Sequence, residues 1–181
     1  MRQRAFVVTV CAVLLFGFGL AQAQGEAPKP GPEHKKLGYF VGSWTTEAEL
    51  MENPLMPAGK FSSTGSCDWF EGGFSVVCKS EGKGPVGPTK ELGIMGYSTD
   101  AKAYTYYGVD NSPMAMLSIA RGTVDGDTWV YDDESMMDGK MVKSRYTIVQ
   151  NSATSYTFEW AMAGEDGKLN TLMKGTSTKA K

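Results

Sequence analysis

The sequence predicts an all-β protein, an antiparallel up-and-down barrel of about ten strands. After residue 42, stretches rich in Val, Ile, Thr, Tyr, Phe and Trp recur about every ten residues, and turn dipeptides containing glycine separate most of them. No long segment after residue 50 has helical periodicity. Closure into a barrel is favoured because it removes exposed strand edges. The expected strands span residues 43–51, 60–70, 74–82, 90–98, 102–110, 114–124, 128–136, 141–149, 155–163 and 168–178.

The N-terminus has the pattern of a cleavable secretory signal. Arg2 and Arg4 precede an uncharged, mostly apolar run over residues 5–20, and Ala21-Gln22-Ala23 supplies the small residues of a cleavage site. The apolar run is shorter than the roughly 20 residues of a membrane-spanning helix, which disfavours a retained anchor. We therefore expect residues 1–23 to be removed and the protein to be exported, to the periplasm or outside the cell.

The expected mature chain is one domain of ordinary charge. Cleavage leaves 16 basic and 20 acidic residues, a net charge of −4, which argues against nucleic acid or an anionic membrane surface as a partner. Residues 24–32, rich in Gly and Pro, predict a flexible linker. Residues 33–40 predict one or two helical turns, and the barrel domain spans residues 33–181. No membrane span is expected in the mature chain, and the oligomeric state stays open.

The cysteines predict a disulfide bond. Signal cleavage leaves only Cys67 and Cys78, and an even pair in an oxidising compartment predicts a bridge. A two-residue turn at Gly72-Gly73 places the cysteines opposite each other, and Trp69 opposite Val76. Such a turn makes the cysteines a hydrogen-bonded pair, with Cα atoms about 5.5 Å apart, although a slightly different turn is possible.

A second hairpin separates apolar from charged residues. A turn at Asp138-Gly139 places Tyr131 opposite Tyr146 on one face. The other face pairs Asp132 with Arg145, so a surface ion pair is the preferred interpretation of this arginine. The apolar face continues the predicted interior of the barrel.

A third hairpin places small residues beside large ones. A turn at Asp125-Gly126 puts Ala120 opposite Tyr131 and Gly122 opposite Trp129, an alternation that suits a tapering barrel interior. The residues expected to line a cavity inside the barrel are Trp69, Val76, Trp129, Tyr131, Tyr146, Ile148, Phe158, Trp160, Met162 and Met173.

Asp133 falls on the apolar face of its predicted strand, near Ser118 and Ser144. A buried carboxylate is costly unless it is hydrogen-bonded. Asp133 is therefore expected either at the barrel mouth or as a polar anchor inside the cavity.

The chain is rich in methionine, with ten beyond the initiator. Flexible thioethers suit gap-filling in a core and equally suit a cavity that accepts varied apolar ligands. They also bind Cu(I), but no regular array of methionines supports a copper site.

No catalytic constellation is visible, and the sequence predicts no enzyme and no cofactor. His34 is the only histidine and lies beside the linker. No imidazole is therefore expected near a nucleophile to act as its base, or near the cysteines to complete a zinc site. The segment Gly82–Gly87 matches neither a phosphate-binding loop nor a dinucleotide fingerprint. It is expected to be a flexible loop at the barrel rim.

The facing of three tyrosines is left open by the sequence. If Tyr97, Tyr104 and Tyr106 point outward together with Met95, they form an exposed apolar patch of the kind that marks a contact surface. If they point inward, they belong to the barrel interior.

Several runs resemble known families. The segment Leu37–Trp44 is similar to the Gly-x-Trp start of calycin barrels, a superfamily that includes lipocalins, fatty-acid-binding proteins and nitrobindins. The resemblance implies that Trp44 closes one end of a lipocalin-like barrel with a hydrophobic interior. Residues 33–178 also resemble a bacterial family known as domain of unknown function 1579. This resemblance implies no particular activity, because the family has no established one. The supporting runs are Cys67–Phe74, Leu92–Tyr97, Tyr104–Gly108 and Lys143–Thr147.

The resemblance to this superfamily does not lead us to expect haem binding. Nitrobindins use a histidine late in the chain as the iron ligand, and this sequence has none after His34. The preferred hypothesis is an exported protein that binds a small apolar or amphipathic molecule inside a barrel. The alternative is a structural or protein-interaction module of the cell envelope that uses the exposed aromatic patch.

Overall fold

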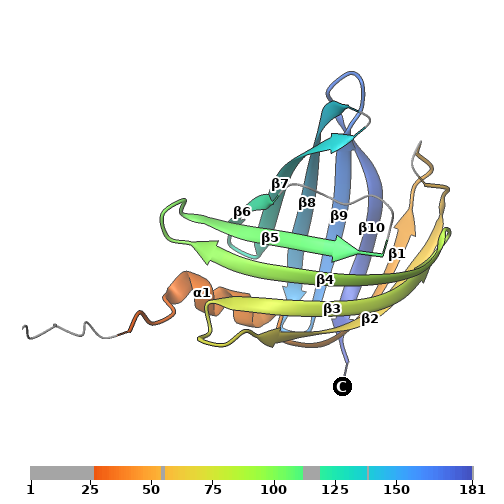
Figure 1. Ribbon diagram of the computed structural model, residues 1–181. Helices are drawn as coiled ribbons and strands as arrows, with labels where there is room; N and C mark the ends of the chain where they lie inside the picture. The colour runs from red at the N-terminus through yellow and green to blue at the C-terminus, as the bar shows by residue number, and fades with distance from the viewer. Residues whose placement is uncertain (1–26, 54–55, 112–118, 138, 181) are drawn as a thin grey trace, which may run out of the picture.

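The chain folds into ten antiparallel strands, each hydrogen-bonded to its neighbour in sequence, and β1 pairs with β10 to close a barrel (Figure 1). This confirms the predicted fold class. The computed structural model describes residues 27–53, 56–111, 119–137 and 139–180, so the expected signal peptide lies outside it. The strands are β1 (Gly42–Leu50), β2 (Gly59–Trp69), β3 (Ser75–Gly84), β4 (Gly87–Ser98), β5 (Ala103–Asp110), β6 (Ala120–Asp125), β7 (Thr128–Met137), β8 (Lys140–Ser152), β9 (Ser155–Ala163) and β10 (Leu169–Lys179).

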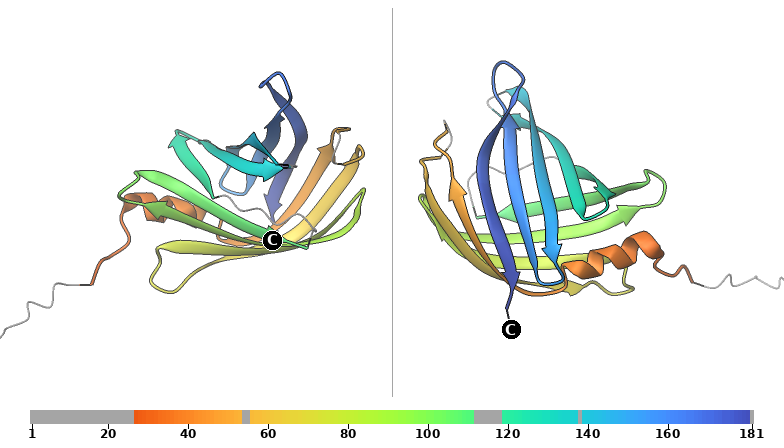
Figure 2. Two further views of the ribbon diagram at one scale, coloured as in Figure 1. Left: turned by 45° about the horizontal axis from the view of Figure 1, so that its top comes forward. Right: turned by 180° about the vertical axis from the view of Figure 1, so that it is seen from behind.

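A short helical segment precedes the first strand, as expected. It consists of α1 (Pro32–Lys36) and the 3₁₀ helix η1 (Leu37–Tyr39) (Figure 2). Pro32 occupies the first helical turn, where a missing N–H costs nothing, so the helix begins at the last residue of the predicted linker. Within the described ranges, neither helix is long and apolar enough to cross a membrane.

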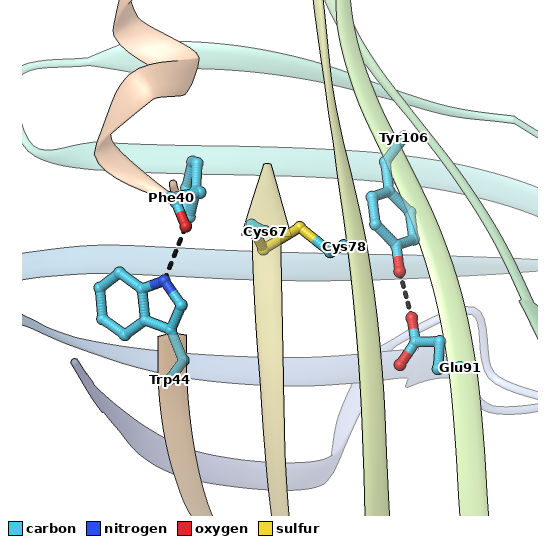
Figure 3. The surroundings of a disulfide bond; sticks show 6 residues. All are labelled: Phe40, Trp44, Cys67, Cys78, Glu91 and Tyr106. Carbon is cyan, nitrogen blue, oxygen red and sulfur yellow. Dashed lines mark hydrogen bonds between the residues drawn. A yellow bond between two sulfur atoms is a disulfide. The ribbon is translucent and has the colours of Figure 1, made fainter. Parts of the chain in front are cut away.

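The helical segment and β1 together seal one end of the barrel. Leu37 and Phe40 are buried in the hydrophobic core, and the Trp44 indole N–H donates to the Phe40 carbonyl at 2.7 Å (Figure 3). The Trp44 ring packs against Tyr156 with ring centroids 4.9 Å apart. Trp44 therefore lies where the resemblance to calycin barrels implied, at the closed end.

The β2–β3 hairpin has the predicted register but a longer turn. Cys67 pairs with Cys78, and the two form the predicted disulfide, with Cα atoms 4.0 Å apart. The Phe70 amide donates to the Ser75 carbonyl at 2.8 Å, so a four-residue loop replaces the two-residue turn. That loop reverses the alternation of hydrogen-bonded pairs. The cysteines thus occupy a non-hydrogen-bonded pair, where strands approach more closely.

The predicted register of the β6–β7 hairpin is wrong by two residues. The turn is Gly126-Asp127, so Gly122 pairs with Tyr131 instead of Trp129. An ideal Cβ built on Gly122 lies 2.6 Å from the Tyr131 ring. Only glycine leaves room for the ring here, which explains why this register is adopted.

The segment Gly82–Gly87 forms a tight hairpin and not the predicted rim loop. β3 continues to Gly84 and β4 starts at Gly87, which pair across the two-residue turn Pro85-Val86. Gly87 has φ = 115°, a conformation that favours glycine. Gly84 and Gly87 therefore flank the tight turn that joins β3 to β4.

Candidate binding site in the open half of the barrel

The strand register places all ten predicted lining residues on the inward face of the barrel, but at different depths. Trp69 lies at the sealed end, where its ring packs on Gly38, and it is 40 % exposed. The buried members are Val76, Trp129, Tyr131, Ile148 and Phe158. The members that keep some exposure are Tyr146, Trp160, Met162 and Met173.

The interior divides into two regions. We use "closed end" for the residues around the helical plug, which are Leu37, Phe40, Trp44, Val76 and Tyr104, all buried. We use "open half" for the inward-facing residues beyond them, which are Glu91, Tyr106, Tyr131, Asp133, Tyr146, Trp160, Met162 and Met173. In the open half, most side chains are inward-facing yet partly exposed.

Asp133 lies inside the open half. It faces inward on β7, directly across from Ser144, and only 9 % of its surface is exposed. Its neighbours along the strand, Asp132 and Glu134, face outward and form ion pairs with Arg145 and Lys143. The predicted outer pair of Asp132 and Arg145 is therefore confirmed, and Asp133 is the inward-facing carboxylate of the three.

A second acidic residue, Glu91, was not predicted as part of the interior. The Cys78–Gly93 pairing fixes the facing of β4 and turns Glu91 to the inward side, where it stays exposed to solvent and the Tyr106 hydroxyl donates to its carboxylate (Figure 3). Counting outward from the cysteine pair could have found it. Its acidic side chain instead suggested a solvent-facing position at a strand end.

Tyr106 and Tyr146 have the character of residues that line an internal hollow. Burial raises the pKa of Tyr106 well above its ordinary value of 10, and the charge of Glu91 adds to the effect. Burial likewise raises the pKa of Tyr146, with smaller contributions from Tyr156 and Glu91. Both side chains nevertheless keep solvent-accessible surface. Deep position and retained exposure occur together when the exposed surface faces an internal space.

The proposed outer aromatic patch does not exist in the form considered. Tyr104 is buried against Trp129, with ring centroids 4.7 Å apart, and Tyr97 packs on Tyr104. Tyr106 contacts Tyr131 inside the barrel. The next residue, Tyr107, faces outward instead and is 40 % exposed.

Among the described residues, the strand ladder is shortest between β5 and β6. These strands pair over Tyr104–Tyr106 only, whereas β1 and β10 pair over seven residues. Beyond Tyr106, β5 continues to Asp110 without a described partner on this side, as Figure 1 shows.

Two hollows lie outside the barrel interior. One of about 680 Å³ lies between α1 and the ends of β3 to β5, and one of about 1030 Å³ lies on β1, β2 and β8 to β10. At the first, His34 Nδ1 accepts a hydrogen bond from the Gly31 amide at 3.1 Å, so this histidine holds the start of α1. Among the described residues, no group of three His, Cys, Asp or Glu side chains is placed to hold a metal ion.

Comparison with known proteins places the chain in a family. A family model described as "Protein of unknown function (DUF1579)" matches residues 29–179. The chain belongs to this family. The match covers every described strand, so the barrel is the family's domain. No curated protein is significantly similar to this DUF1579 chain.

Two solved structures share the fold of this DUF1579 barrel. Rv2717c from M. tuberculosis aligns with a TM-score of 0.59 and 11 % identity, covering 84 % of this chain and 100 % of that one. The S-type phycobiliprotein lyase CPES from Guillardia theta aligns with a TM-score of 0.56 and 14 % identity, covering 82 % and 93 %. At these identities, the likeness establishes a lipocalin-like fold alone.

Proposed function

We propose that the protein is exported and holds a small amphipathic molecule in the open half of its barrel. The observation that carries the proposal is the contrast in exposure along the interior. Apart from Trp69, which is 40 % exposed, the side chains named above for the closed end are buried, whereas Tyr146, Trp160 and Met173 face inward and remain partly exposed. Solvent therefore reaches large apolar side chains from inside the barrel. A small ligand that replaced this water would bury apolar surface, at roughly 25 cal/mol per Å².

The wall formed by β2 and β3 leaves room for such a ligand. Four of its inward positions carry small residues, namely Ser63, Gly65, Ser80 and Gly82, whereas Phe61 near the start of β2 is large. The facing strands β8 and β9 carry Tyr146 and Trp160 instead. Small residues on one wall and rings on the other are the arrangement that lets a barrel of this size enclose one ligand.

Export and the absence of catalysis complete the proposal. The secretory pattern of residues 1–23 and the Cys67–Cys78 disulfide both suit an oxidising compartment outside the cytoplasm. One fold neighbour is named a phycobiliprotein lyase, and a ligand-binding role for a barrel of this type is compatible with that name. We propose binding and not catalysis because no nucleophile with an adjacent base is found among the described residues.

The test is native mass spectrometry of the mature protein purified from its own host, together with binding of the neutral fluorescent probe N-phenyl-1-naphthylamine. A bound small molecule and saturable probe binding are expected. Ser80→Trp, which fills the interior, is expected to weaken probe binding at least tenfold. Ser66→Trp places the same ring on the outward face of the same hairpin and is the matched control. Empty protein that also binds no probe would refute the proposal.

A further inference from the structure

Three successive inward side chains on β7 carry polar atoms without partners. Trp129, Tyr131 and Asp133 are 1 %, 4 % and 9 % exposed. Within the described part of the chain, no hydrogen-bond partner reaches the Trp129 indole N–H, the Tyr131 hydroxyl or either carboxylate oxygen of Asp133. Buried polar groups are normally paired, so each such group calls for a specific explanation. Here three lie in a row and point into the same interior.

Asp133 is the most costly of the three. Burial of a carboxylate without a counter-charge or donors is expensive, and proteins tolerate such groups mainly at functional sites. Ser144 lies directly across from Asp133, yet no hydrogen bond joins them. The nearby guanidinium of Arg145 is on the outer face, bound to Asp132 at 2.7 Å. The protein thus offers no cation to Asp133 from its own described side chains.

Glu91 has the same inward facing but is exposed to solvent, and it adds a second negative group beside this interior. Its carboxylate accepts a hydrogen bond from Tyr106, and its charge contributes to the raised pKa values of both Tyr106 and Tyr146. Tyr106 in turn contacts Tyr131, with ring centroids 6.3 Å apart. Tyr106 and Tyr131 therefore connect Glu91 to the strand that carries Asp133, and the faces of tyrosine rings are favourable to a cation.

Basic residues are confined to the two ends of the interior. Among the inward positions of the described strands, only Lys140 at the start of β8 and Lys179 at the end of β10 are basic. Lys179 lies over the rings of Tyr39 and Trp44 at the closed end. An anionic head group beside Asp133 and Glu91 would therefore meet two carboxylates, and on that side Lys140 is the one inward basic residue of the described strands.

We propose that the molecule held in the open half is an amphipathic amine, with its cationic nitrogen at Asp133 and its apolar body against Tyr146, Trp160 and Met173. This inference rests on the proposed function and names its ligand class. The ammonium N–H groups supply the donors that Asp133 lacks. Glu91 and the tyrosine faces strengthen the attraction without contacting the apolar body. The two carboxylates disfavour fatty acids and other anions.

The test compares three probes with the same chain, dodecylamine, dodecanol and dodecanoate, each below its aggregation concentration. Displacement of N-phenyl-1-naphthylamine measures their affinities. Dodecylamine is expected to bind at least tenfold more tightly than dodecanol, and dodecanoate more weakly than both. If none of the three binds, the proposed function fails and the inference falls with it. If all bind equally, or dodecanoate binds best, binding stands and the inference alone is overturned.

Variants of the carboxylates test which residue is responsible for the preference for dodecylamine over dodecanol. Asp133→Asn is expected to abolish the advantage of dodecylamine over dodecanol, whereas Asp132→Asn, the matched outward control, is expected to retain it. Glu91→Gln is expected to reduce the advantage severalfold and provides a second variant if Asp133→Asn does not fold. A preference that survives both inward changes would overturn the inference. Ligand-free Asp133→Asn is expected to melt no lower than the wild type, because the carboxylate has no partner to lose; a clear fall would assign Asp133 a structural role instead.

Discussion

The closed end and the open half of the barrel are built from similar residues but differ in how their polar groups are satisfied. At the closed end, the Trp44 indole donates to Phe40, and Tyr39 donates to the carbonyls of Ser152 and Ser155 at 2.9 Å each. In the open half, Tyr131 and Asp133 have buried polar atoms with no described partner, and the indole of Trp129, which packs on Phe40, is the one such group that reaches the closed end. The difference teaches that aromatic content alone does not identify a binding region. Buried polar atoms without partners and inward side chains that stay partly exposed identify it better.

The largest effect is expected from truncation of the closed end. Trp44→Ala removes a buried ring and the hydrogen bond to Phe40, so we expect a loss of about 3–5 kcal/mol of unfolding free energy. Trp160→Ala makes the same change in the open half, where the ring is partly exposed, and is expected to cost less than half as much. Urea unfolding of both variants measures the difference. Equal losses would contradict the division of the interior into two regions.

The disulfide lies between the two regions, and its loss is expected to have an intermediate effect. The Cys67–Cys78 bridge closes a short loop, with a sequence separation of 11, so we expect its removal to cost about 2–3 kcal/mol or less. Cys67→Ser combined with Cys78→Ser, compared with the oxidised protein in urea, measures this cost. Thiol counting on unreduced mature protein should find no free cysteine, and two free thiols would refute the bridge.

Alkaline pH is expected to weaken the molecule through its buried tyrosines. Burial, with smaller effects of Glu33 and Tyr97, raises the pKa of Tyr104 to about 12, and burial raises that of Tyr131. The unfolded chain releases these protons near pH 10 while the folded protein retains them. Stability is therefore complete below pH 10 and falls as the pH rises from 10 towards 12. Urea midpoints across this range should show the fall.

Single replacements test the origin of that pH dependence. Tyr131→Phe is expected to make the alkaline fall shallower, because one inward hydroxyl no longer needs to stay protonated. Tyr107→Phe, on the outward face of β5, is the matched control. The explanation fails if both variants change the pH profile to the same extent.

The smallest effect is expected on the outer surface beside the open half. Asp132 and Arg145 form an exposed ion pair at 2.7 Å, and exposed pairs contribute only about 0–1 kcal/mol. Asp132→Asn should therefore cost no more than about 1 kcal/mol, and high salt should reduce the difference further. A larger loss would show that the outer pair supports the interior position of Asp133.

Hairpin counting predicted much of the fold because short turns fix strand register. The cysteine pairing and the Asp132–Arg145 pair both follow from turns centred correctly, although the β2–β3 turn is longer than predicted. The β6–β7 register was wrong because Asp125-Gly126 and Gly126-Asp127 are both plausible turns in the sequence. Steric fit decides between them, since Tyr131 needs the space above Gly122. That contact is invisible without the folded backbone.

The candidate site was less predictable than the fold. Asp133 was recognised because it breaks an apolar face, but Glu91 was missed because an acidic residue near a strand end suggests solvent. The facing of β5 was undecidable because Tyr106 and Tyr107 are adjacent aromatic residues with opposite facing. Alternation of polar and apolar residues gives no answer where both faces carry the same residue type.

Closure of the barrel by β1 and β10 sets an order for folding. The β2–β3 hairpin joins residues close in sequence, so its pairing and its disulfide can form soon after that segment is available. The β1–β10 ladder joins Trp44 to Lys179, at opposite ends of the domain, and contacts of this kind form slowly. Until they form, β1 and β10 each present an unpaired edge, which is a template for association with other chains. Chaperone demand during biogenesis should therefore depend on how late the last strand becomes available.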